Sequence, residues 1–476
     1  MTKLIDAMRT KDTVTENGMP TNSTSLNHCV DLFFHIGAMR GQEKQKKINA
    51  FVKAFEENAL IATKILFWAR DVRGGAGERQ TFREIITYMA ENRTEVLRKN
   101  IHLISEYGRW DDLLVLIGTK LEKEALDLIA EGLRAKNALC AKWMPRPSVK
   151  NSIKKMQSNV IRKHMGLSPK EFRQMLAKIS NTVEQVMCSG EWDKIKYYNV
   201  PSKAMSNYMK AFRKHDEAGF TKYLESLSKG ETKINAEAIY PYDILKNIRS
   251  GEIMGAALQW EALPNYMENS KERMIPVVDV SGSMNSRVGD NPNISCMDVA
   301  LSLGLYISER NVGVFQDAFI TFSEDPQLQV LKGNISERTH QMMTSDWGMN
   351  TNLEAVFKLI LTKAKESNVP PSEMPTMIII LSDMQFDECI EMPNSTAFEM
   401  IKNMYEESSY EIPKIVFWNL RSVKSDCPVH FNKNGVALVS GFSPSLLTSL
   451  LSGKSITPFS MMLDVINKKR YEAITV

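Results

Sequence analysis

The chain has 476 residues, with 60 Lys and Arg against 56 Asp and Glu, and a formal net charge of +4. An apolar fraction of 43% with 24% charged residues is typical of a globular protein and excludes collagen-like, low-complexity and largely disordered chains. The longest aliphatic run, Met377–Leu381, is far shorter than the roughly 20 residues that span a bilayer. The N-terminus has no apolar secretory segment, and the six cysteines lack CxxC spacing. We therefore expect a cytoplasmic protein with reduced thiols.

The charges divide unevenly along the chain. Residues 1–270 hold 42 Lys and Arg against 32 Asp and Glu, a net of +10, whereas residues 271–476 have a net of −6. Such an asymmetry indicates a polyanionic partner for the basic part.

The first 270 residues predict helices almost throughout. Apolar residues recur at helical spacing over 47–69 and 81–90. Ser168, followed by Pro169 and Glu171, predicts a capping box at the start of a further helix. Many helices joined by short polar breaks favour a helical array of the HEAT kind, although no clean sequence repeat is present.

The pattern changes near Lys271, where apolar runs suited to buried strands begin to alternate with helices. This alternation predicts a mostly parallel sheet covered on both faces. We therefore predict a tail over 1–24, a helical domain over 25–270 and an α/β domain over 271–476. Its strands are expected at 274–280, 318–322, 328–331, 377–381, 414–420 and 436–439, and its helices at 297–310, 353–366, 397–407 and from 444 onward.

Oxygen-bearing side chains follow two of these strands. Asp279, Ser281 and Ser283 occupy alternate positions after the first strand, and Asp383 follows the strand Met377–Leu381. Thr351 lies in a loop before a predicted helix. Because ligands of parallel sheets bind beyond the carboxyl ends of the strands, these side chains are candidate ligands for Mg²⁺, or Mn²⁺, which prefer such oxygens. The alternative is a chance turn with an Asx cap.

This pattern resembles the metal-ion-dependent adhesion site (MIDAS) of the von Willebrand factor A domain, which has a Rossmann-like α/β fold. The resemblance implies that Ser281, Ser283 and Thr351 coordinate the metal directly, while Asp279 and Asp383 act partly through waters. It also implies that an acidic group of a protein partner can complete the coordination. No Ser/His/Asp arrangement, HExxH motif or phosphate-binding P-loop accompanies the site.

The densest positive stretch covers residues 142–214, with sixteen Lys and Arg against four acids, a net of +12. Cations of this density neutralise phosphates, and interleaved aromatic residues can stack on the bases of a single strand. The candidate RNA-binding residues are Lys142, Arg146, Lys150, Lys154, Lys155, Arg162, Lys163, His164 and Arg173. The alternative is a solvated helical surface whose aromatic residues belong to the core.

Two further strings join predicted helices. Residues 70–79 (RDVRGGAGER) carry glycines whose exposed amides can bind an anion. Residues 107–113 (YGRWDDL) place Arg109 where it can pair with a carboxylate in a bidentate manner. For both strings we favour the alternative of interhelical packing and turn chemistry, since each Arg has acids close by.

Together with KWMPR (142–146) and GLSPKEFRQML (166–176), these strings resemble the TROVE module of Ro autoantigen-type proteins. They resemble still more closely bacterial and viral relatives in which an uncharacterised TROVE-like domain is fused to a von Willebrand A domain. The resemblance extends from about Asp31 to Asp387. It implies a ring of HEAT-like repeats closed by the A domain, and a ribonucleoprotein scaffold that binds single-stranded RNA ends and small noncoding RNAs.

The sequence therefore favours a non-enzymatic RNA-binding scaffold with a magnesium site and no membrane contact. One rival is a metal-dependent protein-interaction module without RNA binding. Another is a metal-dependent nuclease, for which Asp383 and Asp387 are candidate carboxylates, although Asp387 is expected on a solvent-exposed loop.

Overall fold

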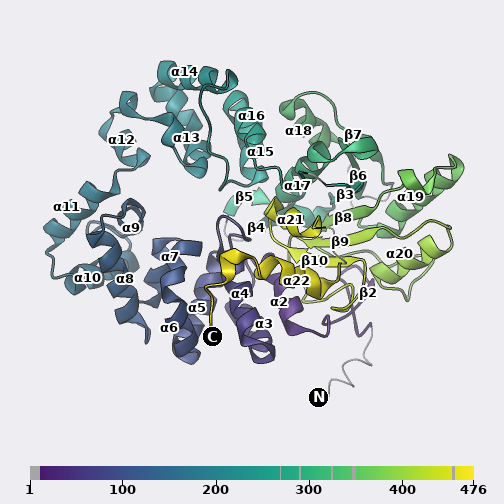
Figure 1. Ribbon diagram of the computed structural model, residues 1–476, viewed down its shortest axis with the longest axis horizontal. Coiled ribbons are helices and arrows are strands. Elements are labelled where there is room, and N and C mark those ends of the chain that lie inside the picture. The colour runs from purple at the N-terminus through teal and green to yellow at the C-terminus, as the bar shows by residue number, and fades with distance from the viewer. Residues whose placement is uncertain (1–10, 269, 289–290, 323–324, 346–349, 453–455) are drawn as a thin grey trace. The chain divides into compact units, whose positions relative to one another are not determined.

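The computed structural model describes residues 11–268, 270–288, 291–322, 325–345, 350–452 and 456–476 (Figure 1). The chain divides into two compact units. The sheet unit comprises Met1–Ile65, Tyr240–Ile253 and Leu263–Arg470, and the helical unit comprises Leu66–Ile239, Met254–Ala262 and Tyr471–Val476. The predicted fold class, a helical array followed by an α/β domain with a mostly parallel sheet, is confirmed.

The compact units are cut differently from the segments predicted from the sequence pattern. Residues 11–65 belong to the sheet unit although most of them are helical, and the last six residues belong to the helical unit. Composition follows the type of secondary structure, whereas compactness follows packing between segments that are distant in the chain. The domain boundaries 1–24, 25–270 and 271–476 stay a prediction from the sequence pattern.

The helical unit is a succession of short helices in which helices close together in the chain pack on one another, including α8 on α9 and α10, α11 on α9, and α13 on α14. Such local packing is expected of helical repeats. Its α-helices include α5 (Gln80–Asn92), α6 (Thr94–Asn100), α7 (Ile104–Tyr107), α8 (Glu122–Arg134), α9 (Ala138–Trp143), α10 (Ser152–His164), α11 (Pro169–Ser180), α12 (Val183–Ser189), α13 (Ser202–His215), α14 (Glu217–Ser228) and α16 (Ile253–Glu261).

Local sequence signals explain several helix ends. The capping box at Ser168 and Glu171 is present at the start of α11, as predicted. The single helix predicted over 47–69 is instead two helices, α3 (Lys44–Glu57) and α4 (Ala59–Arg70). Asn58 has an extended backbone (φ −154°), and its side chain accepts a hydrogen bond from Ile61 N at 3.0 Å. The break arises because Asn58 caps the second helix, a local interaction that apolar periodicity does not report.

The six-stranded sheet has the order β10-β9-β8-β3-β6-β7 and is parallel except for the β6–β7 pair. All six of its strands were predicted, with ends that agree within one residue. They are β3 (Met274–Asp279), β6 (Ala318–Phe322), β7 (Leu328–Val330), β8 (Met377–Ser382), β9 (Lys414–Asn419) and β10 (Val436–Ser440). The central strands read as continuous apolar runs because both of their faces are buried.

Helices cover both faces of this sheet (Figure 1). The crossover helix α17 (Cys296–Arg310) leads from β3 towards β6, whereas α20 (Ala397–Glu406) leads from β8 towards β9 on the other side of β3. Right-handed crossovers in opposite directions place these helices on opposite faces. α19 (Leu353–Glu366) packs on α20. The strand order therefore reverses between β3 and β8, which is where such folds bind ligands.

Two short hairpins were not predicted. β1 (Thr13–Val14) pairs with β2 (Pro20–Thr21), and β4 (Arg287–Val288) pairs with β5 (Asn291–Ser295). Strands of two residues carry no readable alternation of apolar and polar residues. The remaining helices of the sheet unit include α2 (His28–Ile36), α15 (Pro241–Arg249), α18 (Ile335–Thr344) and α22 (Pro458–Ile466).

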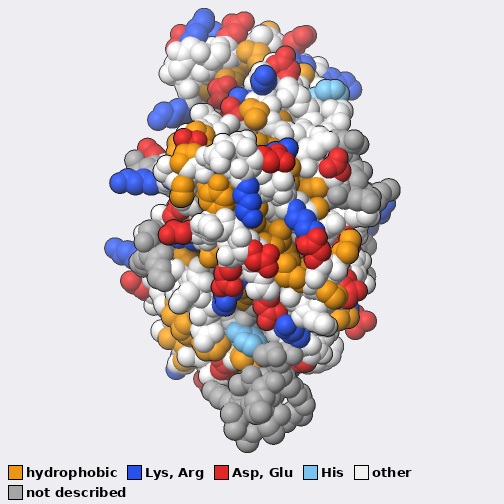
Figure 2. Space-filling model, turned by 90° about the vertical axis from the view of Figure 1, so that its right-hand side faces the viewer, with side chains coloured by type: hydrophobic (Ala, Val, Ile, Leu, Met, Phe, Trp, Pro, Cys, Tyr) orange, Lys and Arg blue, Asp and Glu red, His pale blue; other side chains and the backbone are white. Residues whose placement is uncertain are grey.

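Charges of both signs are interspersed with apolar side chains on the face shown in Figure 2. Over the part of the chain that the structure describes, no helix is long and apolar enough to cross a membrane.

Candidate functional site

The candidate metal residues lie at the point where the strand order reverses. Asp279 is the last residue of β3, and Asp383 directly follows β8, the strand paired with β3. The register pairs Val278 with Leu381, so the two aspartates emerge side by side from the carboxyl edge of the sheet. Both side chains are buried. The parallel pairing explains this convergence, since it brings residues that are 104 positions apart to one edge.

Hydrogen bonds fix the carboxylate of Asp279. Its Oδ1 accepts from Ser281 N at 2.9 Å, and its Oδ2 accepts from the Ser382 hydroxyl at 2.5 Å. The hydroxyls of Ser281 and Ser283 lie 3.0 Å apart. Oxygens of Asp279, Ser281 and Ser283 are thus gathered in one loop, as their alternate spacing predicts.

The electrostatics of this cluster favour a cation. Burial, together with the nearby carboxylate of Asp383, raises the pKa of Asp279 to about 7. Burial also raises the pKa of Asp383, despite a hydrogen bond from Ser283. Asp383 Oδ2 is buried without a hydrogen-bond partner, and the nearest cationic atom paired with it, Arg421 Nη1, is 3.8 Å away. A divalent cation would satisfy this oxygen and relieve the repulsion between the two carboxylates.

The composition of the cluster limits which metals fit. Among the described residues, no three His, Cys, Asp or Glu side chains are grouped so that they could hold a metal ion. A cation here would be held by two carboxylates together with hydroxyls. Such a set suits a hard cation that retains waters, in the way that Mg²⁺ does.

The hydroxyl of Thr351 makes contacts with residues outside the cluster. It contacts Gln385 O at 2.9 Å, Asp387 Oδ1 at 2.8 Å and Asn17 Nδ2 at 2.9 Å. The structure therefore brings Asp279, Ser281, Ser283 and Asp383 together, while the fifth candidate bonds to the segment that follows Asp383. Asp387, expected on a solvent-exposed loop, is instead half-buried and accepts hydrogen bonds from Thr351 N and Oγ1.

The candidate RNA-binding residues divide into two groups. Five of them are exposed on or beside α10 and α11, and none forms an ion pair with a described residue: Lys150, Lys154, Lys155, Lys163 and Arg173. Two large apolar side chains accompany them on α10, since Ile153 is 63% and Met156 is 47% exposed. Exposed cations beside exposed apolar groups suit a ligand that has both phosphates and bases.

The other four candidates have partners inside the protein. Lys142 Nζ donates to Glu184 Oε1 at 2.7 Å, and Arg146 Nη2 donates to the Ser180 hydroxyl at 2.9 Å. Arg162 donates to Asn159, and His164 Nε2 lies 2.8 Å from Asp127 Oδ1. The Lys142 contact joins α9 to α12, and the His164 contact joins α10 to α8. The Arg146 contact joins the segment after α9 to α11, whereas the Arg162 contact lies within α10. Three of the four side chains therefore also stabilise packing between helices.

The aromatic residues of the basic stretch are mostly structural. Tyr197 and Phe212 belong to a buried cluster, and Trp192 stacks on His215 with ring centroids 4.4 Å apart. Tyr198, by contrast, is 52% exposed. The interpretation of these rings as core residues therefore holds for most of them.

The strings at 70–79, 107–113 and 142–146 converge on one buried charge network. Arg70 Nε and Nη2 both contact Asp112 Oδ2 at 2.7 Å, and Arg83 Nε contacts Asp112 Oδ1 at 2.6 Å. Arg109 pairs with Asp111 and lies over the ring of Trp143, 3.9 Å from its centroid. The side chains of Arg70 and Asp112 are 2% and 0% exposed. This network supports the structural interpretation of these strings.

Glycine is required within this network. A Cβ added at Gly75 would lie 1.8 Å from Trp68 O, and one added at Gly108 would lie 2.3 Å from Asp112 Oδ2. These glycines allow close backbone approach.

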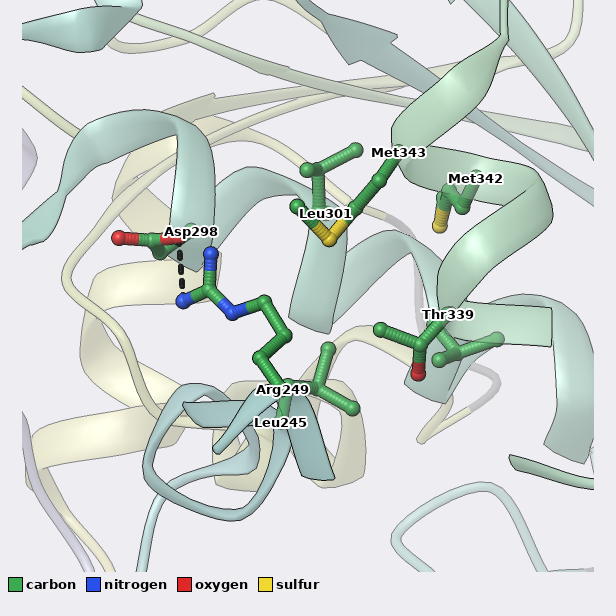
Figure 3. A pocket seen from close by; sticks show the side chains of 8 residues that line it. Leu245, Arg249, Asp298, Leu301, Thr339, Met342 and Met343 are labelled. Carbon is green, nitrogen blue, oxygen red and sulfur yellow. Dashed lines mark ion pairs between the residues drawn. The ribbon is translucent and has the colours of Figure 1, made fainter. Parts of the chain in front are cut away.

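A separate pocket lies between α15, α17 and α18 (Figure 3). Its lining is apolar except for Thr339 and the ion pair between Arg249 Nη2 and Asp298 Oδ1, at 2.7 Å. Neither charged group is left without a partner, and the lining residues include no nucleophile paired with a base. The pocket therefore offers no catalytic arrangement.

Sequence reasoning missed several residues around the metal candidates. Ser382 and Gln385 flank Asp383 and hold the two loops, whereas Asn17 comes from a segment more than 330 residues away. The positions of Ser382 and Gln385 beside a candidate ligand are a signal that could have identified them. Nothing in the sequence connects Asn17 to this site.

Two families of known proteins match this chain, one over its helical part and one over its α/β part. Residues 15–137 and 137–281 match the family described as "Domain of unknown function (DUF2828)", and residues 273–472 match "Domain of unknown function (DUF7788)". The "Uncharacterized protein L728" of Acanthamoeba polyphaga mimivirus is 30% identical over 505 residues, covering 95% of this chain and 86% of the viral protein. Among solved structures, the Deinococcus radiodurans RO (RSR) protein matches with 11% identity and a TM-score of 0.49, over 92% of this chain and 99% of that one.

Proposed function

The chain belongs to the DUF2828 family, and we propose that it is a non-enzymatic RNA-binding scaffold whose α/β domain holds a divalent cation. The observation that carries the proposal is the exposed, unpaired set of cations on α10 and α11. This set lies in a stretch with a net charge of +12, and exposed apolar side chains accompany it. Its ligand class is single-stranded or small noncoding RNA, bound mainly through phosphates.

The residues proposed to contact RNA are ranked by whether their side chains already have partners within the helical unit. Lys150, Lys154, Lys155, Lys163 and Arg173 contact phosphates. Lys142, Arg146, Arg162 and His164 contribute less, because each already has a partner within the helical unit. Charge alone would give the nine candidate RNA-binding residues equal importance, whereas their contacts in the structure do not.

The metal part of the proposal assigns Mg²⁺, or Mn²⁺, to Asp279, Ser281, Ser283 and Asp383, with Thr351 as a further ligand. The partnerless Oδ2 of Asp383 and the pair of buried carboxylates support this assignment. When bound, the cation would supply an open coordination position for an acidic group of a protein partner. The surrounding hydroxyls and carboxylates position it, and no nucleophile–base pair accompanies them among the cluster residues described above.

Filter binding of a single-stranded RNA across a salt series tests RNA binding. Replacing Lys150, Lys154 and Lys155 with Gln should weaken binding and lower the salt slope by about 2, since each phosphate contact with a single strand contributes about 0.7. A matched control replaces Lys120, Lys123 and Lys194, surface lysines that pair with Glu91, Asp127 and Glu191. Equal losses in the two triple variants would contradict a localised RNA surface.

The rival function is a metal-dependent protein-interaction module, which the oxygen cluster itself favours. Asp279→Ala separates the two functions. RNA binding that survives this change supports the scaffold, whereas an Mg²⁺-dependent protein partner lost in Asp279→Ala, with no RNA affinity in the unmodified chain, supports the rival.

A further inference from the structure

The N-terminal hairpin lies against the segment that follows Asp383. β1 and β2 are joined by a turn in which Thr15 N donates to Met19 O at 2.9 Å. Glu16 N donates to Gln385 Oε1 at 2.7 Å, and the Thr15 hydroxyl donates to Phe386 O at 2.7 Å. Both partners lie within three residues of Asp383, so the turn is docked on the candidate metal loop.

Asn17, at the tip of this turn, makes the contacts nearest to the metal candidates. Its Nδ2 donates to Thr351 Oγ1 at 2.9 Å and to Gln385 O at 2.8 Å, while its carbonyl accepts from Glu388 N at 3.1 Å. Gly18, the next residue, forms a backbone bridge with Asp387. Asn17 therefore contacts both the segment that carries Thr351, before α19, and the segment 385–388 that follows β8.

The hydroxyl of Thr351 already has three polar partners. Gln385 O, Asp387 Oδ1 and Asn17 Nδ2 lie 2.8–2.9 Å from its oxygen. Gln385 O and Asp387 Oδ1 are acceptors and compete for the single hydroxyl proton. Asn17 Nδ2 is a donor, so it occupies a lone pair of the oxygen. A cation needs such a lone pair, and the Asn17 amide competes for it directly.

We propose that the N-terminal hairpin is a latch on the metal site: Asn17 holds the Thr351 hydroxyl, and coordination of a cation by Thr351 requires Asn17 to leave. This inference rests on the metal site proposed above. The two contacts are thermodynamically linked. A cation that binds through Thr351 weakens the docking of the hairpin by the same free energy by which the docked hairpin weakens cation binding. The release of segment 15–19 from the metal loop then reports whether a cation is bound.

The test measures Mn²⁺ affinity from the free-ion electron paramagnetic resonance signal of the full chain. Asn17→Ala should bind Mn²⁺ about three- to tenfold more tightly, the range expected from removing a competing hydrogen bond. Ser23→Ala is the matched control, because Ser23 bonds to Asp12 within the same segment but not to the metal loop. Its affinity should equal that of the unmodified chain.

A double-mutant cycle identifies Thr351 as the group through which the latch acts. In a Thr351→Val background, Asn17→Ala should leave Mn²⁺ affinity unchanged. Saturating Mg²⁺ should also accelerate hydrogen exchange at Glu16 N and Glu388 N in the unmodified chain, since both amides are bonded across the docked turn.

The outcomes separate failure of the latch from failure of the metal site. Normal Mn²⁺ binding that is lost in Asp279→Ala, but is the same with and without Asn17, overturns the latch and leaves the metal site standing. Unchanged or slower exchange at Glu16 and Glu388 with Mg²⁺ also overturns it. If the unmodified chain binds no Mn²⁺, the metal site fails and the latch fails with it.

Discussion

Two buried clusters of charge, one in each compact unit, are stabilised in opposite ways. In the helical unit, the carboxylate of Asp112 receives Arg70, Arg83 and the backbone N–H of Arg109. In the sheet unit, the carboxylates of Asp279 and Asp383 lie together, and Asp383 Oδ2 has no hydrogen-bond partner. The first cluster contains its own counterions, whereas the second contains two like charges. The first cluster is therefore complete in itself, and the second is the one at which we propose a cation.

The same substitution in the two clusters should therefore have opposite effects. Asp112→Asn leaves Arg70 buried without a full counterion and should lower the free energy of unfolding by about 3–5 kcal/mol. Urea denaturation followed by circular dichroism measures this loss. Asp127→Asn, at an exposed pair with Lys123, is the control and should cost less than about 1 kcal/mol. A small effect at Asp112 would mean that its network is not a stability element.

His35 offers a third way to bury an ionisable group, which is to keep it neutral. Burial lowers the pKa of His35 to about 4, and its Nδ1 lies 3.1 Å from the Ser422 hydroxyl. Between pH 6.5 and about 4 the unfolded chain binds a proton that the folded chain does not. The free energy of unfolding should therefore fall as the pH drops through this window, by on the order of 3 kcal/mol. His35→Gln should remove this pH dependence of the free energy of unfolding. If the variant keeps the same pH profile, ionisable groups other than His35 cause the acid sensitivity.

Asp279→Asn should leave the metal-free chain at least as stable as the unmodified one, because it removes one of two buried like charges. The difference is expected to be about 1 kcal/mol or less, measured by thermal unfolding in EDTA. Mg²⁺ at 100 times its dissociation constant should stabilise the unmodified chain by about 2.7 kcal/mol and the variant not at all. If the variant were strongly destabilised in EDTA, Asp279 would be a structural carboxylate, like Asp112.

The smallest expected effect separates paired from unpaired lysines within the basic stretch. Lys142→Gln removes the partner of the half-buried Glu184 and should cost about 0.5–1 kcal/mol of unfolding free energy. Lys154→Gln, at an exposed side chain without an ion pair among the described residues, should change it by less than about 0.5 kcal/mol. In RNA binding the order should reverse, with Lys154→Gln having the larger effect.

Much of the sheet unit could be predicted from the sequence. Five strands of the main sheet were identified because each is a buried apolar run of suitable length, whereas β7 is a short, mostly exposed edge strand. The helices at 296–310 and 353–366 were identified because their apolar residues recur at helical spacing. The positions of Asp279 and Asp383 at strand ends also followed, since parallel strands end at one edge. The clustering of four of the five metal candidates agrees with that reasoning.

The partners of individual side chains could not be predicted in this way. Thr351 was grouped with the metal ligands because it carries a hydroxyl in a loop, yet that hydroxyl is held by Asn17, Gln385 and Asp387. Lys142 and Arg146 were counted as free cations, yet they contact Glu184 and Ser180. Net charge is a sum over residues and carries no information about which charges meet.

The sequence by itself determined the elements and the chemistry available at their ends, because periodicity, capping and turn formation are local. It also determined that one stretch is strongly basic and that a set of oxygens follows two strands. Only the tertiary structure decided that residues 11–65 pack with the sheet and that three distant strings form one charge network. It also decided that the side-chain amide of Asn17 donates a hydrogen bond to the Thr351 hydroxyl. Each of these depends on contacts between residues far apart in the chain, which local free-energy preferences do not encode.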